Sequence, residues 1–81
     1  MNRETIITYI KIGREFEFEY KGNKYSITYY NDNRTKYISV CKFNEEPIDV
    51  STPEEALRLT IDGVTIESIL TSLPENKIMI Y

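Results

Sequence analysis

The chain has 81 residues, of which 41% are hydrophobic, and its formal net charge is −3 at pH 7. This length gives one domain over residues 1–81 with a single modest core, and it is too short for an enclosed active-site cavity plus the scaffold around it. Histidine, the commonest general base and metal ligand at neutral pH, is absent. We therefore expect neither an enzyme nor a protein that binds a metal or a cofactor.

The cysteine content and the lack of long apolar runs restrict the cellular compartment in which we expect this protein. Cys41 is the only cysteine, so it has no partner for an internal disulfide. We find no signal-peptide pattern and no apolar run of about 18 residues. We therefore expect a soluble protein of a reducing cytoplasm that does not enter a membrane. No base accompanies Cys41 in a recognisable arrangement, so we interpret it as a small strand residue rather than a nucleophile.

Residues 2–12 combine two patterns. Ile6, Tyr9 and Ile10 recur at helical spacing, whereas the many β-branched residues of this segment favour a strand. Asn2 suits an N-cap, and Gly13 can adopt the left-handed conformation that ends a helix. We predict a helix. The alternative, a strand paired with the segment that follows, would make the fold mostly β.

Residues 14–29 form the clearest pattern, because two alternating runs flank a Gly-Asn pair that is typical of a β-hairpin. With Gly22 and Asn23 as the loop residues, the apolar side chains of both strands face one another on one side, in the pairs Tyr20–Tyr25, Phe18–Ile27 and Phe16–Tyr29. The opposite side of the first strand then carries Glu15, Glu17 and Glu19.

Residues 31–34 form a dense turn cluster, and residues 36–43 alternate as a third strand. With Asp32 and Asn33 as the turn, Ile38 lies opposite Ile27 and continues the apolar face. A longer loop would change this register.

Residues 44–52 are predicted to be a polar connection. Thr52, Pro53 and the glutamates after them are typical of a helix start, and we predict that this helix ends near Thr60. Asp62 and Gly63 break the chain before the next element.

A further helix is predicted from the apolar stripe of residues 66–73, and Pro74 ends it. The tail, residues 77–81, is apolar enough for a short edge strand or for a segment that packs on the core. The sequence leaves both alternatives open.

Together these elements predict an α+β domain with an N-terminal helix, a three-stranded antiparallel meander and two C-terminal helices, to which the tail can add a short C-terminal edge strand. The helices would cover one face of the sheet and leave the other face open. The predicted core consists of Ile6, Tyr9, Ile10, Phe16, Phe18, Ile27, Ile38, Val40, Leu57, Ile66, Ile69 and Leu73.

The glutamates of the first strand follow one another about 6.6 Å apart, given a rise of roughly 3.3 Å per residue. No predicted pocket would perturb their pKa values, which argues against acid–base catalysis and favours a partner-binding surface. Regularly spaced carboxylates beside tyrosines can also imitate the phosphates of nucleic acid. The alternative is that these acidic residues only keep the domain soluble. The predicted partner-binding residues are Glu15, Glu17, Glu19, Tyr30, Tyr37, Glu45, Glu46 and Asp49.

A nucleic-acid-binding protein is the alternative function. Basic side chains are interleaved with tyrosines on the predicted sheet, namely Lys21, Lys24, Arg34, Lys36 and Lys42 with Tyr25, Tyr29, Tyr30 and Tyr37. However, the glutamates occupy the face that would receive phosphates, and the pI near 4.9 is far from that of typical nucleic-acid binders. The sequence therefore favours a protein partner.

The layout of one helix, three strands and two helices resembles small phage-encoded proteins of low-GC Gram-positive bacteria, including anti-CRISPR inhibitors that bind their effector as DNA mimics. The carboxylates that carry this resemblance are Glu15, Glu17, Glu19, Glu45, Glu46 and Asp49. The resemblance implies a non-enzymatic interaction module that inhibits a host nucleic-acid-handling protein by acidic surface complementarity. Lys21, Lys24, Arg34 and Lys36 depart from the pattern, because they would repel a groove that holds phosphate.

We also expect that an exposed edge strand would allow a homodimer formed by sheet extension.

Overall fold

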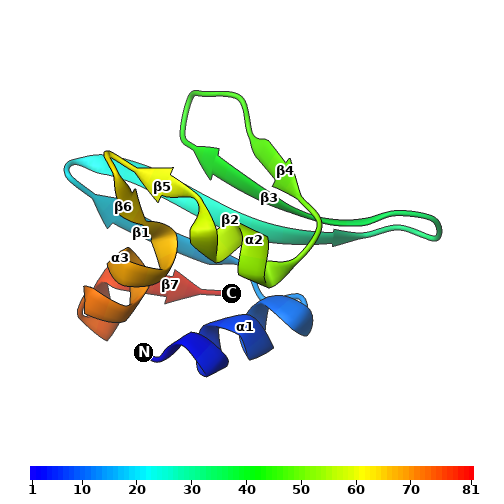
Figure 1. The fold of residues 1–81 in the computed structure, drawn as a ribbon, viewed down its shortest axis with the longest axis horizontal. Helices are drawn as coiled ribbons and strands as arrows, with labels where there is room; N and C mark the ends of the chain where they lie inside the picture. Colours follow the sequence, from blue (N-terminus) through cyan, green and yellow to red (C-terminus); the bar gives the residue numbers. More distant parts are fainter.

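Two layers make up the fold, a sheet and three helices on one of its faces (Figure 1). The computed structural model describes all residues, 1–81. In chain order the elements are α1 (Arg3–Lys11), β1 (Phe16–Tyr20), β2 (Asn23–Asn31), β3 (Lys36–Lys42), β4 (Ile48–Val50), α2 (Pro53–Arg58), β5 (Thr60–Ile61), β6 (Val64–Thr65), α3 (Ile66–Ser72), the 3-10 turn η1 (Glu75–Lys77) and β7 (Ile78–Ile80). The predicted α+β class is confirmed.

The main sheet is antiparallel and has five strands in the order β4-β3-β2-β1-β7, while β5 and β6 form a separate two-stranded hairpin. The three-stranded layout predicted from the sequence was therefore incomplete. The connection over residues 44–52 contains β4, which at three residues is too short to produce a visible alternation. The tail forms the edge strand β7, which is one of its two predicted alternatives.

Helix α1 is confirmed, and its ends follow from its capping residues. The Asn2 side chain accepts a hydrogen bond from the Thr5 backbone N–H at 2.8 Å. Gly13 has a φ of +87°, the left-handed conformation that follows a helix end. Ile6 and Ile10 are fully buried, so the helical spacing and not the β-branching decided this segment.

The β1–β2 hairpin differs from its predicted register by two residues. Lys21 and Gly22 form the turn with φ values of +51° and +78°, as a type I′ turn requires. Phe16 therefore lies opposite Ile27, and Phe18 lies opposite Tyr25. A shift of two residues keeps every side chain on its predicted face. It also places Glu19 opposite Lys24, whereas the predicted register, with Tyr20 opposite Tyr25, sets Lys21 opposite Lys24.

The β2–β3 connection is longer than predicted, which shifts the register here as well. The Asp32 carboxylate accepts hydrogen bonds from the backbone N–H groups of Arg34 and Thr35 at 2.9 and 2.7 Å, so residues 32–35 form the loop. Val40, rather than Ile38, lies opposite Ile27. The apolar face is again unchanged.

The helix that begins after Thr52 is confirmed at its start and was predicted too long at its end. The Thr52 hydroxyl accepts from the Glu55 backbone N–H at 3.1 Å, and Pro53 occupies the first turn. The helix ends at Arg58, and Thr60 already belongs to β5. The next helix, α3, ends at Ser72 before the proline, as predicted.

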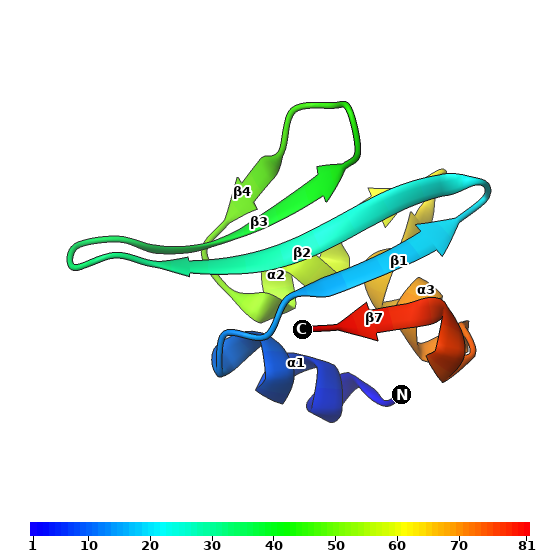
Figure 2. The same cartoon turned by 180° about the vertical axis from the view of Figure 1, so that it is seen from behind.

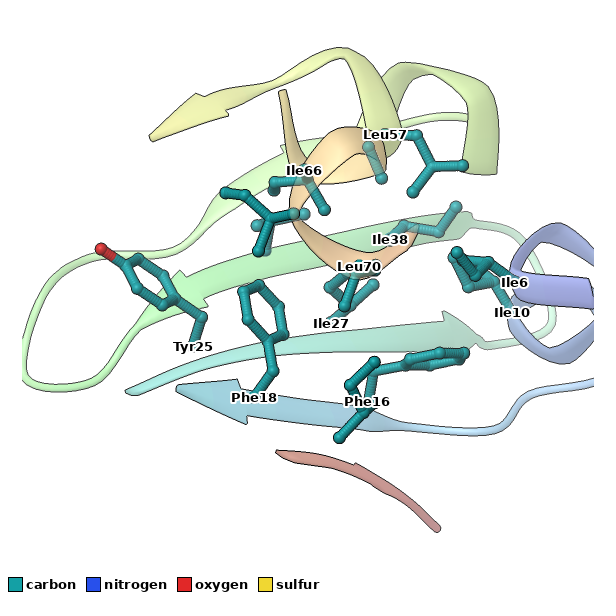
Figure 3. Packing of buried hydrophobic residues seen from close by; sticks show 14 residues of the cluster. Ile6, Ile10, Phe16, Phe18, Tyr25, Ile27, Ile38, Leu57, Ile66 and Leu70 are labelled. Atoms are coloured by element: carbon teal, nitrogen blue, oxygen red, sulfur yellow. The ribbon is translucent and has the colours of Figure 1, made fainter. Parts of the chain in front are cut away.

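The core lies between the helices and the sheet, as Figure 3 shows from close by. It contains 14 buried hydrophobic residues. Ten of the predicted core residues are among them, whereas Tyr9 and Leu73 are only partly buried. The residues that the prediction of the core had left out are Tyr25, Ala56, Leu70 and Ile78.

Candidate interaction surface on the open sheet face

The face of the sheet turned away from the core carries no helix. Figure 2 looks onto this face, where no element crosses over β3, β2, β1 and β7. We call it the open face. Because side chains alternate along a strand, its members follow from the strand pairing. They are Glu15, Glu17, Glu19, Lys24, Ser26, Thr28, Tyr30, Tyr37, Ser39, Cys41, Phe43, Asp49, Lys77, Met79 and Tyr81.

The glutamate stripe, Glu15, Glu17 and Glu19, runs along β1 between β2 and β7. Its first two carboxylates already accept hydrogen bonds. The Thr28 hydroxyl donates to Glu15 at 3.0 Å, and the Tyr81 hydroxyl donates to Glu17 at 3.3 Å. Glu15 and Glu17 are half-buried, whereas Glu19 is exposed. The sequence predicted a freely solvated stripe, but neighbouring side chains orient two of its three members.

The pKa of the Tyr81 hydroxyl is raised above its ordinary value near 10. The main cause is the negative charge of Glu17, which opposes formation of a second anion beside it; partial desolvation, the hydrogen bond to Glu17 and the charge of Glu15 act in the same direction. The phenol therefore stays neutral to a higher pH than a free tyrosine, and it remains a donor to Glu17 over that range.

We expect Glu17→Gln to lower the pKa of Tyr81 toward its ordinary value. A glutamine oxygen can still accept the phenol proton, but it carries no charge that opposes ionisation. A pH titration of the Tyr81 ring resonances by NMR measures this shift. Glu19→Gln is the matched control, since Glu19 is not among the causes of the shift. An unchanged pKa of Tyr81 in the Glu17 variant would contradict the geometry.

Tyr30 and Tyr37 lie opposite each other on β2 and β3, and their rings stack with centroids 5.1 Å apart and an interplanar angle of 20°. The β2–β3 hairpin projects beyond the other strands (Figures 1 and 2). The tyrosine pair belongs to this projection, because it lies past Ile27 and Ile38, where the pairing with β1 and β4 ends. Each ring covers one face of the other, so only the outer ring faces remain for a ligand. The exposed Arg34 and Lys36 lie farther toward the tip.

The structure divides the remaining acidic residues of the predicted set. Asp49 on β4 lies opposite Ser39 and belongs to the open face. Glu45 and Glu46 lie in the β3–β4 loop and border a hollow of about 300 Å³ on the helix side of the sheet. Glu45 also forms an ion pair with Lys42 at 3.1 Å. The six acidic residues of the predicted set therefore do not form one continuous surface.

Sequence reasoning missed the apolar part of the open face. Phe43, Met79 and Tyr81 border a hollow of about 420 Å³ together with Glu17 and Glu19. Lys24 and Lys77 also border this hollow, so its charge is mixed. The position of Phe43 follows from continued alternation past β3, which the sequence could have indicated. Met79 and Tyr81 join the face only because β7 pairs with β1.

The structure contains neither a metal-binding cluster nor a membrane-spanning helix. No three acidic or cysteine side chains come close enough together to hold a metal ion. No helix has the length and apolar character that a membrane span needs. The protein-family models, the curated proteins and the solved structures with which the chain was compared include no match to it.

Proposed function

We propose that this chain is a non-enzymatic protein-interaction module that binds its partner with the open face. The observation that carries the proposal is an uncovered sheet face on which exposed apolar side chains adjoin carboxylates. Antiparallel sheets commonly leave one face solvated, but such a face is then polar. Large exposed apolar side chains gathered on one face favour a binding role over a purely solubilising one.

The apolar side chains are unevenly distributed over the molecule. Six large hydrophobic residues are exposed, and four of them, Tyr30, Phe43, Met79 and Tyr81, belong to the open face. The other two, Ile12 and Ile48, lie apart from each other after α1 and on β4. Aromatic residues and methionine are enriched in protein interfaces because they provide large contact areas. The open face has this composition.

The charged groups around the hollow indicate which kind of side chain the partner would place in it. Glu17 and Glu19 border the same hollow as Met79 and Phe43. An arginine or lysine of the partner has an aliphatic stem for the apolar wall and a cation for the carboxylates. Lys24 and Lys77 at the rim would repel a second cation, which favours one anchoring basic side chain over a broad basic surface.

The narrower proposal concerns the class of partner. A phage-encoded inhibitor of a nucleic-acid-handling host protein, of the anti-CRISPR or another anti-defence type, would use these carboxylates against cations that normally hold phosphate. Glu45 and Glu46 would take no part in the same contact, because they lie on the other side of the sheet. The nucleic-acid-binding alternative is less favoured, since two of the interleaved lysines are paired, Lys21 with Asp62 at 3.8 Å and Lys42 with Glu45 at 3.1 Å.

The test is affinity capture of the tagged chain from a host lysate, with and without nuclease, using two double variants that change the net charge equally. Glu17→Lys with Glu19→Lys alters the hollow. Glu4→Lys with Glu46→Lys alters two exposed carboxylates outside the open face. We expect nuclease-resistant capture that falls at least about tenfold, or roughly 1.4 kcal/mol, in the first variant only.

Two results would overturn the proposal. Equal losses in both double variants would indicate a non-specific effect of charge. Capture that disappears with nuclease would instead favour the nucleic-acid-binding alternative. Far-UV circular dichroism of each variant separates loss of binding from loss of folding.

A further inference from the structure

The sheet has two edges, and they differ in how they are protected from pairing with another strand. The edges are β4 and β7. Natural edge strands carry charged residues, prolines or bulges that prevent pairing with a further strand. Strand β4 follows Pro47 and has Asp49 at its centre. Strand β7, with the sequence Ile78-Met79-Ile80, has none of these features. The β7 edge is therefore the unprotected one.

The hydrogen-bonding groups of β7 that point outward can be assigned from its pairing with β1. The Tyr81 backbone N–H donates to the Glu15 carbonyl at 2.8 Å. Because bonded and non-bonded pairs alternate along an antiparallel ladder, Met79 also bonds to β1, opposite Glu17. The Ile78 N–H donates to the Glu75 carbonyl at the end of η1, so three backbone groups of these two residues face away from β1 without a partner. They are the C=O of Ile78 and the N–H and C=O of Ile80.

Helix α1 does not pack closely against the helix-side face of β7. A hollow of about 420 Å³ separates the first residues of the chain and α1 from β7, and it is bordered by Met1, Asn2, Thr5, Tyr9, Glu75, Ile78 and Ile80. Figure 3 shows β7 as the outermost strand below β1. Ile80 is only half-buried and Met79 is 56% exposed, so both faces of β7 have apolar surface left to cover.

We propose that a second copy of this chain pairs with β7 through its own β7, antiparallel and about a two-fold axis at Met79. In this register Ile78 lies opposite the second copy's Ile80, and Ile80 opposite its Ile78. The Ile80 N–H of each copy then donates to the Ile78 carbonyl of the other copy. The two Met79 side chains meet on the open face, and each Lys77 lies alongside the other copy's Tyr81, the phenol that donates to Glu17.

Several features favour a second copy over another strand-forming partner. A free acceptor, the Ile78 C=O, and a free donor, the Ile80 N–H, lie on either side of Met79, so the edge is complementary to itself in the antiparallel direction. Each Lys77 lies beside the other copy's Tyr81, whose hydroxyl is bonded to Glu17, so the Lys77 cation faces a negative charge at both ends of the strand. The resulting assembly stops at two copies, with β4 at each outer edge of the joint sheet, whereas pairing of β7 with β4 would be a head-to-tail contact that adds further copies as a ring or a filament. The proposal does not depend on the proposed function.

Sedimentation velocity over a wide range of protein concentrations tests this dimer with charge variants of Met79. We expect a dimer for the unaltered chain and for Met79→Gln. We expect Met79→Lys alone and Met79→Glu alone to raise the dimer dissociation constant at least about tenfold, because two like charges then face each other. An equimolar mixture of the Lys and Glu variants should restore the dimer. Met79 is exposed, so these variants leave the core intact.

Hydrogen exchange of the backbone amides adds a second readout at single residues. The amide of Ile80 should be protected in the dimer and exchange faster in Met79→Lys, while the amides of Ile78 and Met79, which are bonded within one copy, stay protected in both. Asp49→Lys on β4 is the control that should leave the dimer unchanged. A monomer at every concentration, an unchanged mass for Met79→Lys, or species that grow beyond the dimer would each overturn the proposal.

Discussion

Replacing Phe16 by alanine is expected to lower the free energy of unfolding by about 3–5 kcal/mol, the range for a large side chain removed from a packed core. Phe16 is fully buried on β1, opposite Ile27 on β2 and Ile80 on β7. The Tyr9 ring of α1 lies 6.3 Å from it between centroids. Removing the Phe16 ring would therefore weaken the packing of β1 against β2 and β7 and the contact of α1 with the sheet.

The expected loss is large compared with the total stability. At about 0.05–0.15 kcal/mol per residue, a chain of 81 residues has roughly 4–12 kcal/mol. Urea unfolding followed by far-UV circular dichroism at one protein concentration measures the change. Phe43→Ala is the matched control, because Phe43 is 42% exposed on the open face and should cost less than about 1 kcal/mol. Comparable losses for the two variants would contradict the packing around β1.

Replacing Leu70 by alanine is expected to cost about 2–5 kcal/mol, and the same change at Leu73 about 1 kcal/mol. Both residues belong to the apolar stripe that the sequence indicates for α3. The structure buries Leu70 completely between α3 and the sheet (Figure 3). Leu73 follows the last residue of α3 and is partly exposed. The sequence had placed Leu73 in the core instead.

This pair distinguishes the folded structure from the helical pattern alone, because the pattern treats the two leucines alike. Urea unfolding of both variants and of the unaltered chain provides the comparison. A larger loss for Leu73→Ala than for Leu70→Ala would mean that α3 packs on the sheet in another rotation.

The open face could be predicted in part. Alternation along β1 put Glu15, Glu17 and Glu19 on one side, and the structure keeps them there. Tyr30 and Tyr37 were predicted to be partner-binding residues, and the structure places both on this face, where their rings stack on each other. Closeness along the chain did not indicate which acidic residues share a surface. Glu45 and Glu46 are close to Asp49 along the chain, yet the turn into β4 places them on the helix side of the sheet.

Edge strands were the hardest elements to predict. A three-residue strand such as β4 or β7 has too few residues for a period of two to be recognised. Its backbone groups find partners only once β3 or β1 is in place. The apolar half of the open face depends on β7, so Met79 and Tyr81 could not be assigned to it from the sequence.

The sequence by itself determined the local elements and the face on which each side chain lies. The Asn2 cap, the Thr52-Pro53 start and the alternation along β1 act within a few residues, so the chain encodes them directly. Only the tertiary structure decided the strand register, the two edge strands and the depth of Leu70 in the core. A shift of two residues preserves the face of every side chain, so the alternation cannot choose between such registers. The turn at Lys21-Gly22 and the loop over residues 32–35 make that choice, together with packing between distant segments.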